Sequence, residues 1–341
     1  MTLRARMVGR TSLSVSEIGF GAAPLGNLFG VVSDEEAEAT LEAAWAAGLR
    51  YFDTAPLYGF GLSEERLGRF LQTKPRDAFV VSTKVGRLLK PNAGWHEQRE
   101  FFIDAGAFEP VFDYSYDGVL RAFESSLDRL GLDRIDLLLM HDIGAATHGD
   151  AHRDLMKAAM EGGGRALQSL RREGQVKAIG LGVNEWQVCA EAMEHGRWDA
   201  FLLAGRYTLL EQEPLQSFFP MCEKEGIGIV VGGPFNSGIL ATGAIDGAHF
   251  NYGAAPADVL ARVRRMDAVC RAHGVPLPAA ALQFPLAHPL VAAVIPGVAD
   301  RNQLAAALSH ARIEIPVALW SDLKGEGLLP VDAPVPGEAR P

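Results

Sequence analysis

Three short apolar runs in the first half of the chain each end at an ionisable residue. These end residues are Asp53, Lys84 and His141, and Tyr58 follows the first of them closely. A strand that is buried on both faces reads as a continuous apolar run, so a charge at its last position lies where the strand leaves the core. If the strands are neighbours in one parallel sheet, the four side chains meet at one edge of it.

The four residue types form a workable acid–base set. A tyrosine has a pKa of about 10 and is a poor base at neutral pH unless a nearby cation stabilises its phenolate. Lys84 supplies such a cation if Asp53 holds its ammonium group, and His141 can donate a hydrogen bond to an oxygen that gains negative charge. Such a set moves a proton to or from an alcohol or carbonyl oxygen. Because it cannot take a hydride, it implies a redox cofactor.

Each residue alone also has an ordinary explanation. An aspartate at a strand end often caps a helix, a lysine there is often solvated, and a single histidine is often a hydrogen-bonded core residue. Two other functions remain open on these residues. Lys84 could form a Schiff base in a barrel aldolase, or the chain could be a binding protein without catalysis.

The elements that must position these residues alternate between strand and helix. Apolar runs predict strands at residues 18–22, 50–54, 79–84, 135–141, 176–183, 200–203, 227–231 and 290–295. Helical spacing predicts helices at residues 33–47, 64–73, 116–130, 164–173, 187–194, 215–224 and 257–273. Ser33 and Glu36 predict a capping box at the start of the first helix.

This alternation predicts an α/β fold of the (β/α)8 TIM-barrel type. No G-x-G-x-x-G fingerprint follows an early strand, which argues against a doubly wound dinucleotide-binding sheet. Residues 7–20 predict an N-terminal β-hairpin before the barrel. In a closed parallel barrel the C-terminal ends of the strands converge on one mouth, which would bring the four candidate residues together.

Two connections, residues 85–117 and 234–257, are too long for simple barrel loops. Long connections in compact domains are commonly lids or binding loops, and both leave C-terminal strand ends. We therefore expect them to wall the site. The tail after residue 328 is rich in proline and glycine and is expected to be loosely ordered. We expect a single domain over residues 1–341.

Composition narrows the class of partner. The net charge is −10 and the pI about 5.4, which argues against general nucleic-acid binding. No apolar run is long enough to span a bilayer, and the N-terminus has no apolar signal region, so no membrane association is expected. Cys189, Cys222 and Cys270 lie far apart and show no metal-ligand spacing. We predict no metal and a cytoplasmic location.

Three motifs show a family resemblance. Residues 52–59 (FDTAPLYG), 82–84 (STK) and 136–141 (DLLLMH) resemble those of the aldo-keto reductase superfamily, and the likeness extends over nearly the whole chain. The resemblance implies a (β/α)8 barrel with a nicotinamide cofactor. It also implies a catalytic tetrad of Asp53, Tyr58, Lys84 and His141, with Tyr58 as the general acid/base.

Within that superfamily, residues 21–29, 180–186 and 204–210 resemble the sugar 1-dehydrogenase branch. Its members oxidise the anomeric carbon of L-fucose, D-threo-aldoses or L-galactose to a lactone, and a sister group does the same with the cyclic hemiacetal of pyridoxal. The resemblance implies a small-molecule substrate of this kind, a cyclic sugar or pyridoxal. General aldehyde or ketone reduction is an alternative, and so is a binding role like that of channel β-subunits. The oligomeric state stays open.

The resemblance also implies a cofactor-binding set, in which Asn184 holds the carboxamide, residues 233–238 cover the pyrophosphate and residues 296–303 hold the adenosine half. The full set is Gly21, Ala22, Asp53, Asn184, Tyr207, Gly233, Pro234, Phe235, Asn236, Gly238, Pro296, Gly297, Val298, Asp300 and Gln303.

Three positions depart from the family pattern. Gly232 stands where many relatives have an aromatic residue on the nicotinamide ring, and Ala204 stands where many have glutamine, so Tyr207 is assigned as the stacking ring. Asp300 would repel a 2′-phosphate but can accept from a free 2′-hydroxyl. We therefore expect NAD, while the neighbouring Arg301 keeps NADP possible.

Overall fold

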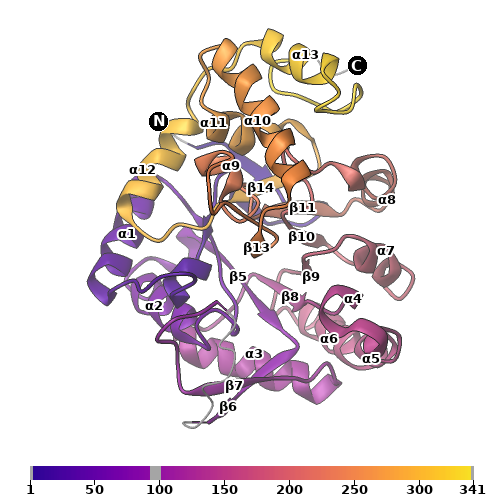
Figure 1. Ribbon diagram of the computed structural model, residues 1–341. Helices are drawn as coiled ribbons and strands as arrows, with labels where there is room; N and C mark the ends of the chain where they lie inside the picture. Colours follow the sequence, from indigo (N-terminus) through magenta and orange to yellow (C-terminus); the bar gives the residue numbers. More distant parts are fainter. Residues whose placement is uncertain (1–2, 93–100, 339–341) are drawn as a thin grey trace.

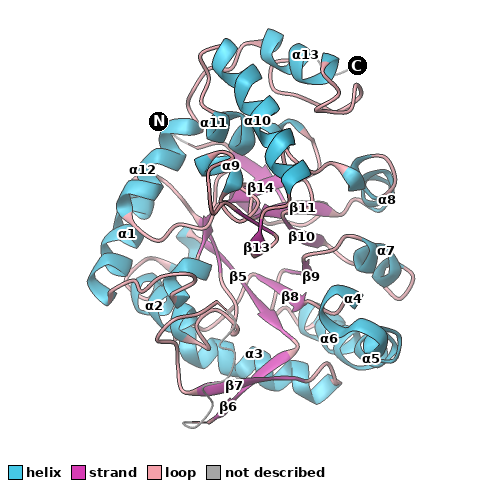
Figure 2. Cartoon of the chain, in the orientation of Figure 1, coloured by secondary structure: helices cyan, strands magenta, loops and turns pink. Residues whose placement is uncertain are grey.

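The computed structural model describes residues 3–92 and 101–338, with parallel strands at the centre and helices around them (Figures 1 and 2). The central sheet consists of β3 (Phe20–Gly21), β4 (Tyr51–Asp53), β5 (Val80–Val85), β8 (Leu137–His141), β9 (Ala178–Val183), β10 (Ala200–Ala204), β11 (Gly228–Gly232) and β14 (Val291–Ile295). Each strand pairs in parallel with the next one along this series. The predicted TIM barrel is confirmed.

The barrel closes where the first strand meets the last. Ile18 forms a parallel bridge with Val294, and Gly21 forms one with Gly297. The backbone N–H of Gly21 donates to the carbonyl of Pro296 over 3.0 Å. A Cβ at Gly21 would lie 2.9 Å from that same oxygen, so only glycine permits this approach. This seam lies directly at the mouth of the barrel.

The predicted hairpin is present, and it lies at the opposite end of the barrel. Strands β1 (Ala5–Met7) and β2 (Ser14–Ser16) pair antiparallel. Buried Val8, Leu13 and Val15 belong to the same apolar cluster as the inward-facing residues of the barrel strands. The hairpin therefore plugs the bottom of the barrel and leaves the mouth open.

Helices cover the outside of the barrel (Figure 2). They are α1 (Asp34–Ala46), α2 (Leu62–Leu71), α3 (Tyr116–Leu130), α5 (His152–Ala159), α6 (Arg165–Arg172), α7 (Gln187–Met193), α8 (Phe218–Glu225), α10 (Ala257–Ala272), α11 (Leu277–Gln283), α12 (Arg301–His310) and α13 (Val317–Gly325), with short α4 (Ala145–His148) and α9 (Ile239–Thr242). Helices α5, α11, α12 and α13 were not predicted. No helix of the described chain combines the length and apolarity needed to cross a bilayer.

The capping box at α1 is only half formed. The Ser33 hydroxyl accepts from the backbone N–H of Glu36, as expected. The Glu36 carboxylate does not return to the cap; it accepts from the backbone N–H and the guanidinium of Arg301. That part of the prediction was wrong, because an arginine at the start of α12 is a stronger partner for a carboxylate than a neutral amide.

Both long connections contain hairpins that the sequence did not reveal. The first holds β6 (Arg87–Pro91) paired antiparallel with β7 (Phe108–Phe112), beside α3; residues 93–100 of this predicted loop lie outside the described residues. The second holds α9 and the short hairpin β12 (His249–Phe250) and β13 (Gly253–Ala254).

The expectation of a loosely ordered tail was wrong for most of its length. After α13 the chain forms no further helix or strand up to Glu338. Leu328, Leu329, Ala333 and Val335 are nonetheless buried and belong to the main core cluster. Apolar side chains at these positions fix the tail in spite of its proline and glycine content.

Candidate active site

The structure brings Asp53 and Lys84 together at the ends of adjacent strands. The Lys84 ammonium donates to Oδ2 of Asp53 and to the backbone carbonyl of Thr54, each over 2.8 Å. The other carboxylate oxygen, Oδ1, accepts from the Ser82 hydroxyl over 2.6 Å. Both charged side chains are almost completely buried, so neither charge is solvated and neither side chain can rotate freely.

Tyr58 lies above this pair on the connection between β4 and α2. Its ring centre is 4.7 Å from the Lys84 ammonium nitrogen. The connection is fixed by a close backbone contact, since a Cβ on Gly26 would lie 2.5 Å from the carbonyl carbon of Tyr58. Burial raises the pKa of Tyr58, and the positive charge of Lys84 acts in the opposite direction.

His141 completes the group. Its ring centre is 6.1 Å from that of Tyr58, with the two planes nearly perpendicular. Burial, together with the charges of Arg87 and Lys84, holds the pKa of His141 well below its usual range. The ring is therefore neutral at physiological pH and can donate one hydrogen bond without carrying charge. The structure thus gathers all four residues of the predicted tetrad at one mouth.

Two further charged residues at this mouth were not predicted. Arg87 follows β5, and Asp142 directly follows His141; their side chains form a buried ion pair at 3.1 Å. Asp142 also accepts from the amide nitrogen of Asn184 over 3.3 Å. The available signal was position: each residue lies within three positions of a predicted strand end, at Lys84 or His141.

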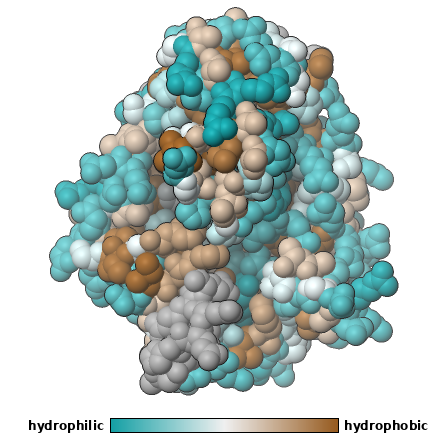
Figure 3. Space-filling model, viewed as in Figure 1, coloured by the Kyte–Doolittle hydropathy of each residue, from teal (hydrophilic) through white to brown (hydrophobic). Residues whose placement is uncertain are grey.

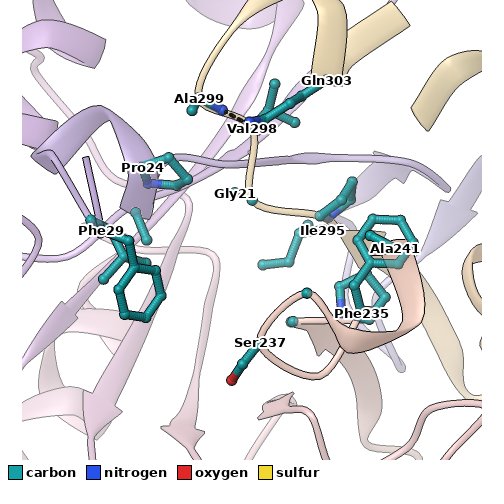
Figure 4. Close-up of a pocket in the computed structure, with 18 of the residues that line it drawn as sticks. Gly21, Pro24, Phe29, Phe235, Ser237, Ala241, Ile295, Val298, Ala299 and Gln303 are labelled. Carbon is teal, nitrogen blue, oxygen red and sulfur yellow. Dashed lines mark hydrogen bonds between the residues drawn. The ribbon is translucent and has the colours of Figure 1, made fainter. Parts of the chain in front are cut away.

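A cavity of about 860 Å³ opens beside Tyr58 and crosses the mouth, with a volume suited to a large organic ligand (Figure 4). Pro24 and Phe29 lie on one side of it and Phe235 and Ala241 on the other, with Gly21 between them (Figure 4). The predicted site residues that line it are Gly21, Asp53, Tyr58, Asn184, Gly233, Pro234, Phe235, Asn236, Gly238, Pro296, Gly297, Val298, Asp300 and Gln303.

Two predicted cofactor residues do not line the cavity. Tyr207 is fully buried in the core, with its ring centre 4.6 Å from that of Phe219 and 5.4 Å from that of Phe284. It cannot stack on a ligand in the cavity, because other aromatic rings already surround it. Ala22 is also buried, and its carbonyl accepts from the Ser63 hydroxyl.

Other lining residues use their side chains to shape the walls. Asn236 donates to the carbonyl of Gly205 over 3.1 Å and accepts from the hydroxyl of Thr208 over 2.6 Å, which fixes the loop after β11. Asp300 caps α12 by accepting from the backbone N–H of Gln303. The side chain of Gln303 in turn accepts from the backbone N–H of Ala299, the contact drawn in Figure 4.

Aromatic side chains meet across the entrance. The rings of Phe101 and Tyr252 stack with centres 5.5 Å apart, and Phe29 lies 5.2 Å from Phe101. Phe101 lies in the connection after β6, Tyr252 in the connection after β11 and Phe29 in the connection after β3. Phe29 and Tyr252 line the cavity. All three are at least 40% exposed. The side of the molecule shown in Figure 3 is mostly hydrophilic, with separate hydrophobic groups.

Comparison with known proteins places this chain in a family. The model of the Aldo/keto reductase family matches residues 17–324. The chain belongs to this family. It is 45% identical to pyridoxal 4-dehydrogenase from Microbacterium luteolum, over 95% of this chain and 97% of that protein. It is also 45% identical to D-threo-aldose 1-dehydrogenase from a Pseudomonas species, over 93% and 96%.

A solved structure supports the same fold. The holo form of an aldo-keto reductase from Bacillus halodurans superimposes with a TM-score of 0.73, over 99% of this chain and 100% of that one, at 24% identity. Membership of the aldo/keto reductase family makes the chain an oxidoreductase that acts on a CH–OH group and uses a nicotinamide cofactor.

The cavity fits a nicotinamide cofactor. Its walls carry glycines where backbone must come close to a ligand, at Gly232, Gly233 and Gly297 among others. The lining includes Tyr58 and Asn184 beside the tetrad, and Asp300 and Gln303 at the start of α12. A ligand that carries a reactive ring and a nucleoside could contact both sets of residues.

Proposed function

We propose that this protein oxidises the hemiacetal carbon of a cyclic substrate to a lactone, with NAD as the hydride acceptor. The observation that carries the proposal is the position of Tyr58. Its ring lies 4.7 Å from a buried ammonium group and forms part of the cavity wall. A tyrosine so placed can exchange a proton with a substrate hydroxyl inside the cavity.

Each residue of the tetrad has a role in the oxidation. Tyr58, as phenolate, takes the proton of the anomeric hydroxyl, and Lys84 stabilises the phenolate. Asp53 holds the Lys84 ammonium group in place. His141, neutral, donates to the substrate oxygen as its charge develops. When bound, the nicotinamide ring supplies the acceptor for the hydride that leaves the anomeric carbon. The hydroxyl oxygen then forms the carbonyl of the lactone, and the proton remains on Tyr58.

The cavity walls support specific cofactor contacts. Asn184 lines the same cavity as Tyr58 and is proposed to hold the carboxamide of the nicotinamide. Residues 233–238 form the wall expected to cover the pyrophosphate, and residues 296–300 with Gln303 form the wall expected to hold the adenosine half. Tyr252 also lines the cavity, with its hydroxyl 3.5 Å from Oδ1 of Asn184, and it replaces Tyr207 as the candidate ring beside the nicotinamide.

Charges at the adenosine end favour NAD over NADP. Two carboxylates, Glu36 and Asp300, line the cavity there. Arg301, the cation that could attract a 2′-phosphate, is held in an ion pair with Glu36 at 3.1 Å. A 2′-phosphate would meet two negative groups and a cation that is already engaged, whereas a 2′-hydroxyl can donate to either carboxylate.

The substrate class is a cyclic hemiacetal, of which an aldose of the L-fucose or D-threo type is the first candidate. One of the two relatives above is named for such an aldose. Pyridoxal is the second candidate, because the aromatic entrance formed by Phe29, Phe101 and Tyr252 offers ring faces to a planar substrate. Sugars offer hydroxyl groups to the same space.

The test is absorbance at the reduced-nicotinamide band with purified protein, NAD or NADP, and a panel of L-fucose, L-galactose, D-arabinose, pyridoxal and open-chain alcohols. We expect reduction of NAD with a cyclic hemiacetal. Tyr58→Phe should bind NADH as the unsubstituted protein does and lose about 100- to 10,000-fold in turnover. Activity with open-chain alcohols alone, or full activity in Tyr58→Phe, would contradict the proposal.

A further inference from the structure

The ion pair between Arg87 and Asp142 has no role in the chemistry described so far. Both terminal nitrogens of the Arg87 guanidinium, Nη1 and Nη2, donate to Oδ2 of Asp142. The two side chains are 6% and 9% exposed. Removing two charges from water is costly, so a buried pair is weak evidence for a purely stabilising role. Its place beside His141 needs a different explanation.

The backbone of Asp142 is also strained. Its φ angle is +46°, in the left-handed region that residues other than glycine seldom adopt. The conformation is held by a hydrogen bond from its own N–H to the carbonyl of Gly182 and by the Tyr114 hydroxyl, which donates to the carbonyl of His141 over 2.9 Å. Strain of this kind concentrates at functional sites, where the surrounding structure enforces it.

The strained backbone places one carboxylate among three neighbours. Oδ2 of Asp142 accepts both hydrogen bonds from Arg87 and lies 3.4 Å from Nε2 of His141. Oδ1 accepts from the amide nitrogen of Asn184 over 3.3 Å. This carboxylate therefore connects a residue of the tetrad to the residue placed to hold the nicotinamide carboxamide.

We infer that Arg87 and Asp142 are positioning residues of the active site: the carboxylate fixes the amide of Asn184 and keeps the single ring proton of His141 on Nε2, while Arg87 balances the carboxylate so that the ring does not gain a second proton. The inference rests on the proposed function for the roles of His141 and Asn184, and on the contacts above for the device itself.

The amide orientation follows from its two neighbours. The nitrogen Nδ2 of Asn184 points to an acceptor on Asp142, and the oxygen Oδ1 lies 3.5 Å from the hydroxyl of Tyr252. A carboxylate accepts only, so it determines which end of the amide faces it. Without Asp142, nothing on that side would distinguish the two ends, and the carboxamide of the cofactor would meet a mixture of donor and acceptor.

The protonation of His141 follows from the charges that face it. Lys84 on β5 and Arg87 on β6 are cations, Asp142 is an anion, and the hydroxyl of Tyr58 is neutral. A carboxylate near Nε2 favours the tautomer with its proton there. Left without Arg87, the same carboxylate would attract a second proton and make the ring a cation.

The first test is Arg87→Met, studied by NMR of protein labelled with ¹⁵N-histidine. In the unsubstituted protein we expect His141 to stay neutral at physiological pH, with its proton on Nε2. In Arg87→Met we expect its pKa to rise, because one of the two cations that lower it is gone. The dissociation constant of NADH should increase about tenfold, as expected when a hydrogen bond to a charged group is loosened. In Arg87→Met, kcat/KM should also show an additional fall at acidic pH that is absent in the unsubstituted protein.

The double variant R87M/D142N tests the balance of charges. It removes both charges, keeps an oxygen that can accept from Asn184, and uses asparagine, which tolerates the left-handed backbone. We expect the pKa of His141 to fall back from its value in Arg87→Met and kcat/KM to recover in part. D142N alone is the second variant if Arg87→Met does not fold; it should raise the fraction of His141 with its proton on Nδ1.

Arg76→Met is the matched control. Arg76 donates to Oδ2 of Asp136 over 2.7 Å, and Asp136 directly precedes β8 just as Asp142 directly follows it. The control removes the same type of charge at the other end of the same strand. It should lower stability and leave His141 and NADH binding unchanged.

An unchanged His141 titration and NADH affinity in a folded Arg87→Met protein would overturn the inference. A double variant in which His141 titrates as it does in the single variant would also overturn it, because the inference attributes the extra ring proton to the unbalanced carboxylate of Asp142. Neither the NMR nor the NADH titration requires a substrate. Both results therefore stand if the proposed cyclic hemiacetal turns out to be wrong.

Discussion

Lys84 donates to Asp53 over 2.8 Å at a point where neither side chain is more than 3% exposed. Burial alone would lower the pKa of Lys84, but Asp53 and Tyr58 more than offset it, so the pKa is raised and the ammonium stays charged. The cation beside Tyr58 is therefore permanent over the whole range in which the protein functions. The effect of this cation on the pKa of Tyr58 can be measured from the pH dependence of the reaction.

We expect the oxidation to speed up as the pH rises. Burial raises the pKa of Tyr58, so at neutral pH only a small fraction is phenolate, and this fraction grows with pH. In Lys84→Met the opposing cation is gone, and the rise in rate should move to higher pH. The measurement is kcat/KM against pH for both proteins, with the double variant D53N/K84M as a control without an unpaired buried carboxylate. A profile in Lys84→Met that coincides with the original would be evidence against this role of Lys84.

The protein should lose stability in mild acid because of His141. Folding lowers the pKa of this residue, so below its unfolded value of about 6.5 the unfolded chain binds a proton that the folded chain does not. Above that pH His141 does not reduce the free energy of unfolding. As the pH drops below it, the free energy of unfolding falls by up to about 1.4 kcal/mol per pH unit. Urea unfolding at several pH values should show a shallower slope for His141→Asn. Equal slopes would mean that other groups account for acid unfolding.

Cofactor preference should change with two substitutions at the adenosine end. Glu36→Gln releases Arg301 from its ion pair, and Asp300→Ser removes a negative charge while serine still caps α12. The double variant E36Q/D300S should raise the ratio of kcat/KM with NADP to that with NAD by about tenfold or more. A salt bridge elsewhere, between Arg265 and Glu326, provides the control variant Glu326→Gln. If the original protein prefers NADP, the assignment of NAD is wrong.

The aromatic entrance should distinguish pyridoxal from sugars. Phe101→Ala removes the ring that stacks on Tyr252 and contacts Phe29, and so weakens the wall offered to a planar substrate. We expect KM for pyridoxal to rise severalfold more than KM for L-fucose, since aromatic pairs are worth about 0.5–1.5 kcal/mol. Met221→Ala, at another exposed apolar position, is the control. An equal rise for both substrates would show that the entrance does not select.

The barrel and its mouth could be predicted because each strand carried its own signal. Asp53, Lys84 and His141 end apolar runs, and in a parallel barrel all such ends meet. The observed strands differ from the predicted ones by a residue or two, as for β5, which is Val80–Val85 against the predicted 79–84. Local pattern and global fold agree here, so position in the sequence was enough to place the chemistry.

The residues that sequence reasoning missed depend on tertiary contacts. The position of Arg87 three residues after Lys84 does not by itself indicate that Arg87 turns inward to Asp142. A short hairpin after β5 and a left-handed backbone at Asp142 bring the two together. Tyr207 was misplaced for the opposite reason. An aromatic residue after β10 can face the cavity or the core, and the neighbouring rings of Phe219 and Phe284 draw it into the core.

The seam between the first and last strands has a consequence for synthesis. Residues 18–21 have their second set of partners at residues 294–297, so the earliest barrel strand keeps one open edge until residues 294–297 have left the ribosome. An open strand edge is a template for pairing with another chain. The lining of the cavity includes Gly21 on one side of this seam and Gly297 on the other, so the cavity can form only after the last barrel strand has been synthesised. A truncated chain that ends before β14 would lack one wall of the cavity.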